Sequence, residues 1–277
     1  MDKQTTYFRD KVIIITGASS GIGMAAARMF FSLGARLSLA ARRIDILKDL
    51  AHDLTDDPER IICVKTDVTV EDDCRSLIEL TARHFGRIDI LINNAGLSMR
   101  SPFIDVDLKV IKTLMDVNFW GTVYCTKFAL PYLLESHGSV VGVISTAGYA
   151  PLPGRSGYVT SKFAVRGFLE TLRMEHTKDH LHVMVFAPGY TASNVRNAAL
   201  LADGTPQSYS PKDESKLMQA DAVAEKLADG LCRKKREMIL TALGYWDVFL
   251  YKRFPRIMDR VQLNYIRRKE KQGDPFH

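Results

Sequence analysis

Short apolar runs rich in β-branched residues alternate with longer amphipathic segments along most of the 277-residue chain. Strands are predicted at 12–16, 36–40, 61–65, 88–92, 139–144, 181–187 and 237–240, and helices at 21–33, 44–54, 71–85, 107–136, 157–179 and 220–234. Four of the runs are apolar nearly throughout, which is typical of parallel strands covered on both faces. Strict strand–helix alternation implies right-handed crossovers. We therefore predict an α/β fold: one doubly wound domain with a seven-stranded parallel sheet and helices on both faces.

The composition excludes several classes of protein. The chain is 46% hydrophobic and 25% charged, as in ordinary globular proteins. No apolar run approaches the roughly 18 residues that span a bilayer, and the polar residues 1–6 do not resemble a secretory signal. The four cysteines lack metal-ligand spacing and are Cys63, Cys74, Cys125 and Cys232. We therefore expect neither a metal site nor disulfides, and a cytoplasmic location, with attachment to a membrane surface as the alternative.

Positive charge is concentrated near the C-terminus. Residues 233–271 hold 12 basic and four acidic residues, whereas residues 1–232 hold 26 basic and 27 acidic ones. The net charge of +6 therefore does not indicate nucleic-acid binding by the body of the protein. We predict a domain at 1–242, with a lid at 189–216, and a basic amphipathic extension at 243–277 packed on or beside it.

A glycine-rich turn, Thr16-Gly17-Ala18-Ser19-Ser20-Gly21-Ile22-Gly23, lies between the first predicted strand and the first predicted helix. Glycines let the backbone approach a pyrophosphate, and the helix N-terminus offers free N–H donors. The spacing G-x-x-x-G-x-G differs from the common G-x-G-x-x-G fingerprint, and by itself also fits a turn without a ligand. Its position after the first strand favours a Rossmann-type dinucleotide site.

The end of the second strand favours one form of that dinucleotide. An acidic residue here usually binds the ribose 2′-hydroxyl of NAD, but this chain has Ala40-Ala41-Arg42-Arg43. Two guanidinium groups could bind a 2′-phosphate, which favours NADP(H) over NAD(H). The alternative is that Arg42 and Arg43 only solvate a helix start, where cations are mildly unfavourable.

Together with later motifs, residues 10 to about 240 resemble the short-chain dehydrogenase/reductase family, and more weakly its hydroxysteroid-dehydrogenase-like branch. The later motifs are Asp67-Val68, Asn93-Asn94-Ala95-Gly96, the set Asn118, Ser145, Tyr158 and Lys162, and Pro188-Gly189. The resemblance implies catalytic roles for Asn118, Ser145, Tyr158 and Lys162. It implies cofactor binding by Gly17, Ser19, Ser20, Gly21, Ile22, Gly23, Arg42, Arg43, Asp67, Val68, Asn94, Ala95, Gly96, Tyr158, Lys162, Pro188, Gly189, Thr191 and Ser193.

The residue types support the implied chemistry. Tyr158 and Lys162 are four residues apart, hence on one face of a helix, and an ammonium beside a phenol favours the phenolate. Such a tyrosine suits hydride transfer, in which an alcohol oxygen loses a proton or a carbonyl oxygen gains one. Ser145 follows the fifth strand, where its hydroxyl can polarise the substrate oxygen. Asn118 is a poor interior helix residue and indicates a kink or a bound water, and the family uses it to hold a relay water.

The resemblance places Asp67-Val68 at the adenine ring and Pro188-Gly189 beside the nicotinamide. Asp67 precedes a predicted helix and also fits a capping role, which Thr69 could fulfil instead. After Pro188-Gly189, Ser193 stands where the family usually has threonine and keeps the hydroxyl for the carboxamide. Thr191 replaces a small apolar residue.

We therefore predict an NADP(H)-dependent oxidoreductase that interconverts a carbonyl and a secondary alcohol. The pocket residues expected from 149–157 and from the lid are mostly apolar: Tyr149, Leu152, Tyr190, Val195, Leu200 and Leu201. They favour a substrate with an apolar body. One alternative is a non-catalytic NADP(H)-binding sensor or scaffold, which has no need of Ser145, Tyr158 and Lys162 together. An epimerase or dehydratase would need further acid/base groups that we do not identify.

The C-terminal extension has apolar residues at helical spacing after Pro255, which is tolerated in a first turn. These are Phe254, Ile257, Met258, Val261 and Tyr265, surrounded by arginines and preceded by Trp246, Phe249 and Leu250. One interpretation is a weak contact with an anionic membrane surface or a cap for a lipid-like substrate. The other is a helix packed on the body or on a second subunit. The family resemblance implies a homodimer or homotetramer paired through 107–136 and 157–179.

Overall fold

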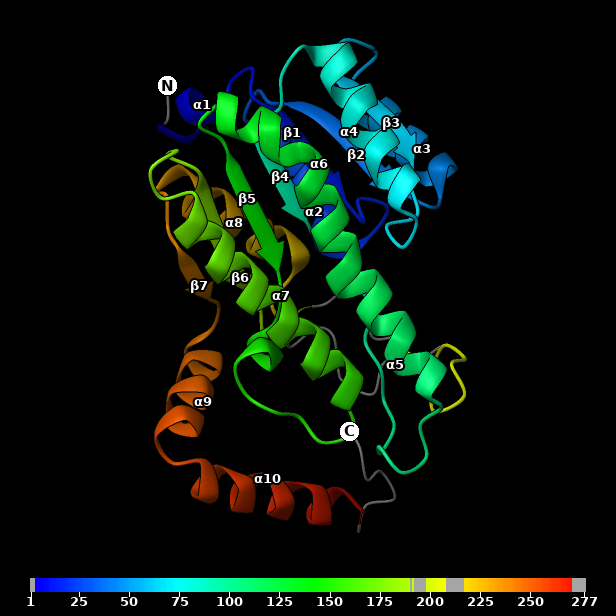
Figure 1. The fold of residues 1–277 in the computed structure, drawn as a ribbon, viewed down its shortest axis with the longest axis vertical. Helices are drawn as coiled ribbons and strands as arrows, with labels where there is room; N and C mark the ends of the chain where they lie inside the picture. Colours follow the sequence, from blue (N-terminus) through cyan, green and yellow to red (C-terminus); the bar gives the residue numbers. More distant parts are fainter. Residues whose placement is uncertain (1–2, 190, 192–197, 208–216, 271–277) are drawn as a thin grey trace.

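One parallel sheet forms the centre of the molecule (Figure 1), and its strands lie in the order β3-β2-β1-β4-β5-β6-β7. The structure, a computed structural model, describes residues 3–189, 191, 198–207 and 217–270. The strands are β1 (Val12–Thr16), β2 (Arg36–Ala41), β3 (Ile61–Lys65), β4 (Ile90–Asn93), β5 (Ser139–Val143), β6 (His182–Ala187) and β7 (Glu237–Ile239). The predicted seven-stranded, doubly wound α/β fold is therefore confirmed.

Helices follow the strands and cover both faces of the sheet. They are α1 (Lys3–Phe8), α2 (Gly21–Ser32), α3 (Ile44–Leu54), α4 (Glu71–Phe85), α5 (Leu108–Leu114), the π-helical turn η1 (Met115–Trp120), α6 (Gly121–Glu135), the 3₁₀ turn η2 (Thr146–Gly148), α7 (Ser156–Glu175), α8 (Ala220–Cys232), α9 (Ala242–Arg253) and α10 (Pro255–Glu270). Two of these helices are followed by a glycine with left-handed backbone angles, which is a common way for a helix to end: Gly34 (φ 90°) follows α2, and Gly86 (φ 74°) follows α4.

Alternate residues of the buried strands pack into two hydrophobic layers. Ile13 and Ile15 of β1 join the layer that contains side chains of α2, α3 and α8. Ile14, between them, joins the opposite layer, which contains side chains of α4, α6 and α7. Such two-sided burial explains why β1 is apolar at nearly every position.

Three predicted boundaries are wrong by more than one residue, and one predicted helix is interrupted; the first of these boundaries is the end of the predicted helix 220–234, which lies at Cys232. The predicted strand 88–92 begins at Ile90, and the carboxylate of Asp89 just before it accepts a hydrogen bond from the backbone N–H of Val12 at 3.0 Å. The predicted helix 107–136 is broken by the π-helical turn η1. The predicted helix 157–179 ends at Glu175, because residues 177–180 form a turn.

The strand order reverses between β1 and β4, and such a point is where doubly wound sheets bind ligands. The chain leaves β1 toward one side of the sheet and β4 toward the other, so their carboxyl ends border an open crevice. After β7 the chain turns away from the sheet, and α9 and α10 lie at the lower end of the view in Figure 1. Within the described ranges, no helix combines the length and apolar character needed to cross a bilayer.

Candidate active site

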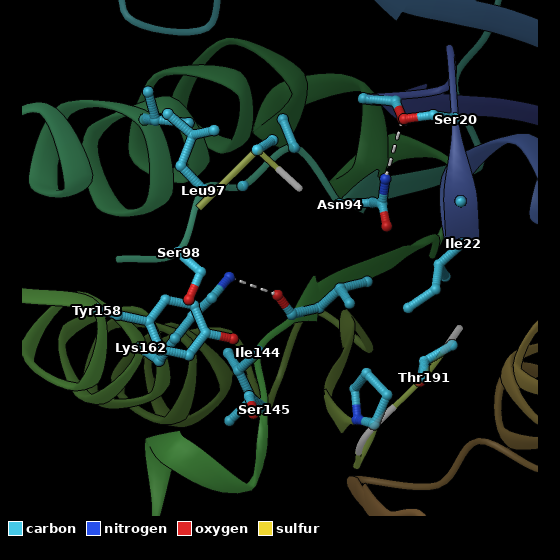
Figure 2. Close-up of a pocket in the computed structure, with 18 of the residues that line it drawn as sticks. Ser20, Ile22, Asn94, Leu97, Ser98, Ile144, Ser145, Tyr158, Lys162 and Thr191 are labelled. Carbon is cyan, nitrogen blue, oxygen red and sulfur yellow. Dashed lines mark hydrogen bonds between the residues drawn. The ribbon is translucent and has the colours of Figure 1, made fainter. Parts of the chain in front are cut away.

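A cavity of about 860 Å³ lies at the carboxyl ends of the central strands. Eighteen predicted site residues line it: Gly17, Ser19, Ser20, Gly21, Ile22, Arg42, Arg43, Asp67, Val68, Asn94, Ala95, Gly96, Ser145, Tyr158, Lys162, Pro188, Gly189 and Thr191. Figure 2 shows Ser20 and Ile22 on one side of this space and Ser145, Tyr158 and Lys162 on another. Gly23 and Asn118 are not among the lining residues, and Ser193 lies outside the described residues.

The glycine-rich turn leaves the first turn of α2 open toward the cavity. Gly17 and Gly21 have left-handed backbone angles, with φ of 67° and 54°. A Cβ atom on Gly23 would lie 2.4 Å from the carbonyl oxygen of Gly17, so only glycine fits there. Ser20, which precedes α2, makes no side-chain capping bond, and Gly21 and Ile22 of the first helical turn line the cavity. An anionic group such as a pyrophosphate fits this helix N-terminus.

Asn94 joins the turn after β4 to the turn after β1. Its side-chain Nδ2 donates to the backbone carbonyl of Thr16 at 2.9 Å, and its backbone N–H donates to the Thr16 hydroxyl at 3.0 Å. The N–H of Ala95 donates to the same hydroxyl at 3.1 Å. Because three bonds meet at one threonine, the two turns hold a fixed separation at the crevice.

The two arginines after β2 have different surroundings. Arg43 Nη2 donates to the Ser19 hydroxyl at 3.1 Å, which links this turn to the glycine-rich turn. Arg42 lines the cavity with an exposed side chain and has no hydrogen-bond partner among the described residues. The neighbouring residue is Ala41, so the end of β2 offers two cations and no carboxylate to the cavity.

Asp67 stabilises a turn and does not cap α4, whose N-cap residue Val70 has no side-chain capping bond. Its Oδ1 accepts hydrogen bonds from the backbone N–H and the hydroxyl of Thr69, at 3.0 and 2.8 Å. The residue also lines the cavity beside the buried Val68. The structural turn and the cavity wall are therefore built from the same side chain.

Lys162 is a buried ammonium group beside Tyr158. Its Nζ donates to the backbone carbonyl of Val143 at 3.0 Å and lies 5.8 Å from the centroid of the Tyr158 ring. Burial lowers the pKa of Lys162 to about 8, because desolvation disfavours the charged form. Both residues project from one face of α7, as their spacing predicts.

Ser145 lies at the end of β5, where its Oγ accepts a hydrogen bond from the N–H of Ala147 at 3.2 Å. That bond leaves the hydroxyl hydrogen free to be donated elsewhere. In Figure 2, Ser145 lies at the same end of the cavity as the ring of Tyr158. A substrate oxygen placed here has a donor from β5 and a second one from α7.

Asn118 lies in the wide turn η1, which confirms the predicted interruption of the helix. Its Oδ1 accepts from the N–H of Leu97 at 2.8 Å, and its Nδ2 donates to the Leu97 carbonyl at 2.9 Å and to the Ser161 hydroxyl at 2.8 Å. The side chain therefore clamps the segment after β4 against α7. Its role in holding a water stays a prediction.

The segment before α7 closes another side of the cavity. Arg155 Nη1 donates to the Ser98 hydroxyl at 2.6 Å and to the Met99 carbonyl at 2.8 Å. Leu152, which was predicted to line the pocket, does so together with Pro153. Three other predicted pocket residues do not line this cavity: Tyr149, Leu200 and Leu201. Tyr149 is buried beneath the guanidinium of Arg166, whose Cζ lies 4.2 Å from the ring centroid.

Backbone hydrogen bonds fix the positions of the two leucines of the predicted lid, Leu200 and Leu201, outside the cavity lining. Leu200 pairs with the segment after β4, because its N–H donates to the Ser98 carbonyl and its carbonyl accepts from the N–H of Arg100. The N–H of Leu201 donates to the Thr205 carbonyl within a turn. Tyr190 and Val195, also predicted for the pocket, lie outside the described residues.

Residues of the C-terminal extension line the cavity and were not predicted individually. They are Leu243, Gly244 and Asp247 of α9 and Gln262 and Ile266 of α10. Asp247 is half-buried, and desolvation raises the pKa of its carboxyl group. Two features of the sequence could have indicated these residues. Asp247 is a carboxylate between Trp246 and Val248 in an otherwise apolar stretch, and two lining residues of each helix are four positions apart.

Comparison with known proteins agrees with this site. The family model described as short chain dehydrogenase matches residues 11–202. The chain belongs to this family. The 11-beta-hydroxysteroid dehydrogenase 1A of Arabidopsis thaliana is 37% identical over 82% of this chain and 67% of its own length. Dehydrogenase/reductase SDR family member 7B of Rattus norvegicus is 31% identical over 97% of this chain and 85% of its own length.

Solved structures of the short-chain dehydrogenase family extend the comparison. An alcohol dehydrogenase of Thermococcus sibiricus complexed with 5-hydroxy-NADP superposes with a TM-score of 0.73 and 26% identity, over 84% of this chain and 96% of that one. A short-chain dehydrogenase/reductase of Burkholderia phymatum in complex with NAD gives a TM-score of 0.81 at 22% identity, over 90% and 95% of the two chains. The second likeness shows the fold alone.

Proposed function

We propose that the protein is an NADP(H)-dependent oxidoreductase that interconverts a carbonyl and a secondary alcohol on a mostly apolar substrate. One observation carries this proposal: Ser145, Tyr158 and Lys162 line the same cavity as the glycine-rich turn. Proton-transfer groups and a phosphate-binding turn are thus within one space. A sensor or scaffold would need only the second of these.

The chain's own residues manage the proton of the reaction. Bound at the crevice, the nicotinamide would supply or accept the hydride. Tyr158 then gives a proton to the substrate oxygen in reduction and takes it back in oxidation. Lys162, with a pKa of about 8, remains mostly charged at neutral pH and favours the phenolate of its neighbour. Ser145 donates to the substrate oxygen and holds it at the tyrosine.

The cofactor preference rests on the turn after β2. Arg42 offers a guanidinium that has no hydrogen-bond partner among the described residues, and the Ala41 side chain offers no acceptor for a ribose 2′-hydroxyl. A 2′-phosphate would satisfy the guanidinium with charge-assisted hydrogen bonds. Solved relatives bind either dinucleotide, so the preference for NADP(H) comes from these two residues.

The substrate class rests on the lining beyond Tyr158. Leu152, Leu243 and Ile266 present apolar surface there, and Asp247 is the carboxylate that α9 adds. Apolar walls with a few placed polar groups are typical of small-molecule sites. The names of the Arabidopsis relatives support a hydroxysteroid-like or other lipid-like alcohol.

A panel of apolar ketones and secondary alcohols tests the activity, with NADPH absorbance as the readout. We expect turnover with at least one lipid-like member, and its loss in Tyr158→Phe. Binding of NADPH without turnover of any member would favour the sensor or scaffold instead. NADPH binding is measured separately by fluorescence titration, so that a folded but inactive protein is recognised.

We further propose a reducing, cytoplasmic location and a homodimer or homotetramer. All four cysteines are free, which supports a reducing compartment. The helices implied in pairing expose Trp120 of η1 and Phe163 of α7, at 43% and 41%. A second copy could cover these side chains. Light scattering of the purified protein measures the oligomer directly.

A further inference from the structure

One end of the molecule exposes large apolar side chains from two separate stretches of sequence. Both stretches lie toward the lower end of the longest axis in Figure 1: the segment that leads into α5 together with the first residue of that helix, and helices α9 and α10. We call their exposed side chains the apolar end: Phe103, Ile104, Leu108, Trp246, Phe249, Leu250, Phe254, Ile257, Val261 and Leu263. Ile104 is 90% exposed and Trp246 is 55% exposed. The side chain of Tyr265 lies outside the described residues.

The body of the protein does not cover the outer side of α9 and α10. Leu243 and Asp247, four residues apart, line the cavity, where Leu243 is still 78% exposed, whereas Trp246 and Phe249 are exposed without lining it. On α10, Gln262 and Ile266 line the cavity, whereas Ile257 and Val261 are exposed. Each helix therefore has one side on the cavity and a second, apolar side without a partner in the described chain. Large exposed apolar side chains that gather at one end of a molecule often mark an interaction site.

Charge distinguishes among the partners that could cover this end. Residues 252–268 contain six basic residues and a single acidic one, Asp259. Arg256, Arg260 and Arg267 are exposed on α10 beside the apolar side chains. A second copy docked through the same surface would bring like charges together. An anionic partner is complementary to the arginines, and a partner with an apolar interior also buries Trp246 and Ile257.

We propose that the apolar end docks on the surface of a bilayer that contains anionic lipids. The aromatic and aliphatic side chains enter the boundary between headgroups and acyl chains, and the arginines pair with lipid phosphates. No spanning helix is required. In this position the two helices that wall the cavity lie against the lipid, and an apolar substrate can pass between bilayer and cavity without crossing water.

Vesicle flotation tests the docking and needs no turnover, so it is independent of the proposed oxidoreductase activity. Full-length protein is floated with phosphatidylcholine vesicles, with and without phosphatidylglycerol, at low and high salt. We expect co-flotation with the anionic vesicles at low salt, weakened by high salt. Trp246→Ser with Phe249→Ser should lower the partition coefficient roughly tenfold or more. Arg256→Glu with Arg260→Glu should lower it on anionic vesicles only.

Met174→Ser is the matched control, because this methionine is 74% exposed near the carboxyl end of α7 and lies outside the apolar end. It should float like the parent. NADPH titration and circular dichroism of each variant show that the fold is retained. The proposal is overturned if the parent stays in solution with anionic vesicles at low salt, or if the Trp246 and Phe249 changes have no effect. It is also overturned if the Trp246 and Phe249 changes dissociate a dimer instead of lowering vesicle binding. Tighter binding of the parent protein to duplex DNA than to vesicles would overturn it as well.

Discussion

Arg43 donates a hydrogen bond through Nη2 to the hydroxyl of Ser19, at 3.1 Å, and so ties the turn after β2 to the glycine-rich turn after β1. The adjacent Arg42 has no such bond in the described part of the chain and lines the cavity. The two arginines, which the sequence offers as equivalent, are therefore expected to act differently. Arg43 positions the pyrophosphate turn, and Arg42 is available to a ligand.

Arg42→Ala should weaken NADPH binding ten- to a hundredfold, because a charge-assisted hydrogen bond contributes about 1.5–3 kcal/mol. NADH binding should be nearly unchanged. Arg43→Ala should instead weaken both dinucleotides by a similar factor, since it loosens the turn around Ser19. Fluorescence titration of both cofactors against the two variants measures this. Equal losses for NADPH and NADH in Arg42→Ala would refute the assignment, and adding Ala41→Asp to that variant should reverse the preference.

Tyr158→Phe should lower kcat by about 100-fold or more, because the change removes the hydroxyl that transfers the proton. The NADPH dissociation constant should stay within a few-fold of the parent value. Steady-state kinetics and cofactor titration on the same preparation separate the two effects. If turnover stays within a few-fold of the parent, another residue is the acid.

Lys162→Met should stabilise the cofactor-free protein at neutral pH. The pKa of Lys162 is about 8 in the folded protein and ordinarily 10.5, so the unfolded chain binds more protons between these values and stability rises with pH across that window. Below pH 8, burial of the charged ammonium destabilises the folded protein by on the order of 3 kcal/mol. Lys162→Met removes this cost but also loses the hydrogen bond to the Val143 carbonyl, which contributes about 1 kcal/mol. Urea unfolding from pH 6 to 10.5 should therefore show a gain that shrinks as pH rises. A gain of the same size at every pH would contradict the burial argument.

Gly23→Ala should lower NADPH affinity at least roughly tenfold and also lower the melting temperature. The added Cβ would lie 2.4 Å from the Gly17 carbonyl oxygen and 2.5 Å from Nδ2 of Asn94, so the pyrophosphate turn must shift. Gly167→Ala in α7 is the matched control, because its Cβ would meet no atom within 4 Å. That change should stabilise the protein by about 0.5–1 kcal/mol, through helix propensity. Calorimetry of the two variants would be expected to give shifts of opposite sign.

Asp247→Leu should alter the choice among substrates. A half-buried carboxylate disfavours a wholly apolar group beside it and favours one that can donate a hydrogen bond. The variant should raise kcat/KM for plain aliphatic ketones several-fold and lower it for ketones with a distant hydroxyl. Asp259→Leu, on the exposed side of α10, is the control. A uniform change for both kinds of ketone would show that Asp247 does not face the substrate.

The sheet and most of the cavity were predictable because they depend on local patterns. Apolar runs such as 12–16 identify strands buried on both faces, and the glycines at 17–23 have a backbone reason to be there. Asn118, an unfavourable residue for a helix interior, correctly indicated the interruption now seen as η1. These inferences required only neighbours in the sequence.

Burial at particular side chains was not predictable in the same way. Tyr149 has the residue type of a pocket wall but lies beneath Arg166, a contact between residues 17 positions apart. The predicted helix after Pro255 is confirmed, yet its periodicity could not show which side meets the cavity. The π turn and the long-range contacts of α9 and α10 arise from tertiary packing, which overrides local propensity.

The wall built by Leu243, Gly244, Asp247, Gln262 and Ile266 lies downstream of the stretch, 11–202, that matches the family model. Apart from Leu152, which lies between Ser145 and Tyr158, most of the wall that we propose for substrate choice is therefore encoded after the residues that we propose for the reaction chemistry. The segment after residue 241 can therefore accumulate substitutions, or be exchanged between paralogues by recombination, without altering Ser145, Tyr158 or Lys162. A chimaera that carries another relative's C-terminal portion would be expected to inherit that relative's substrates while retaining this chain's cofactor.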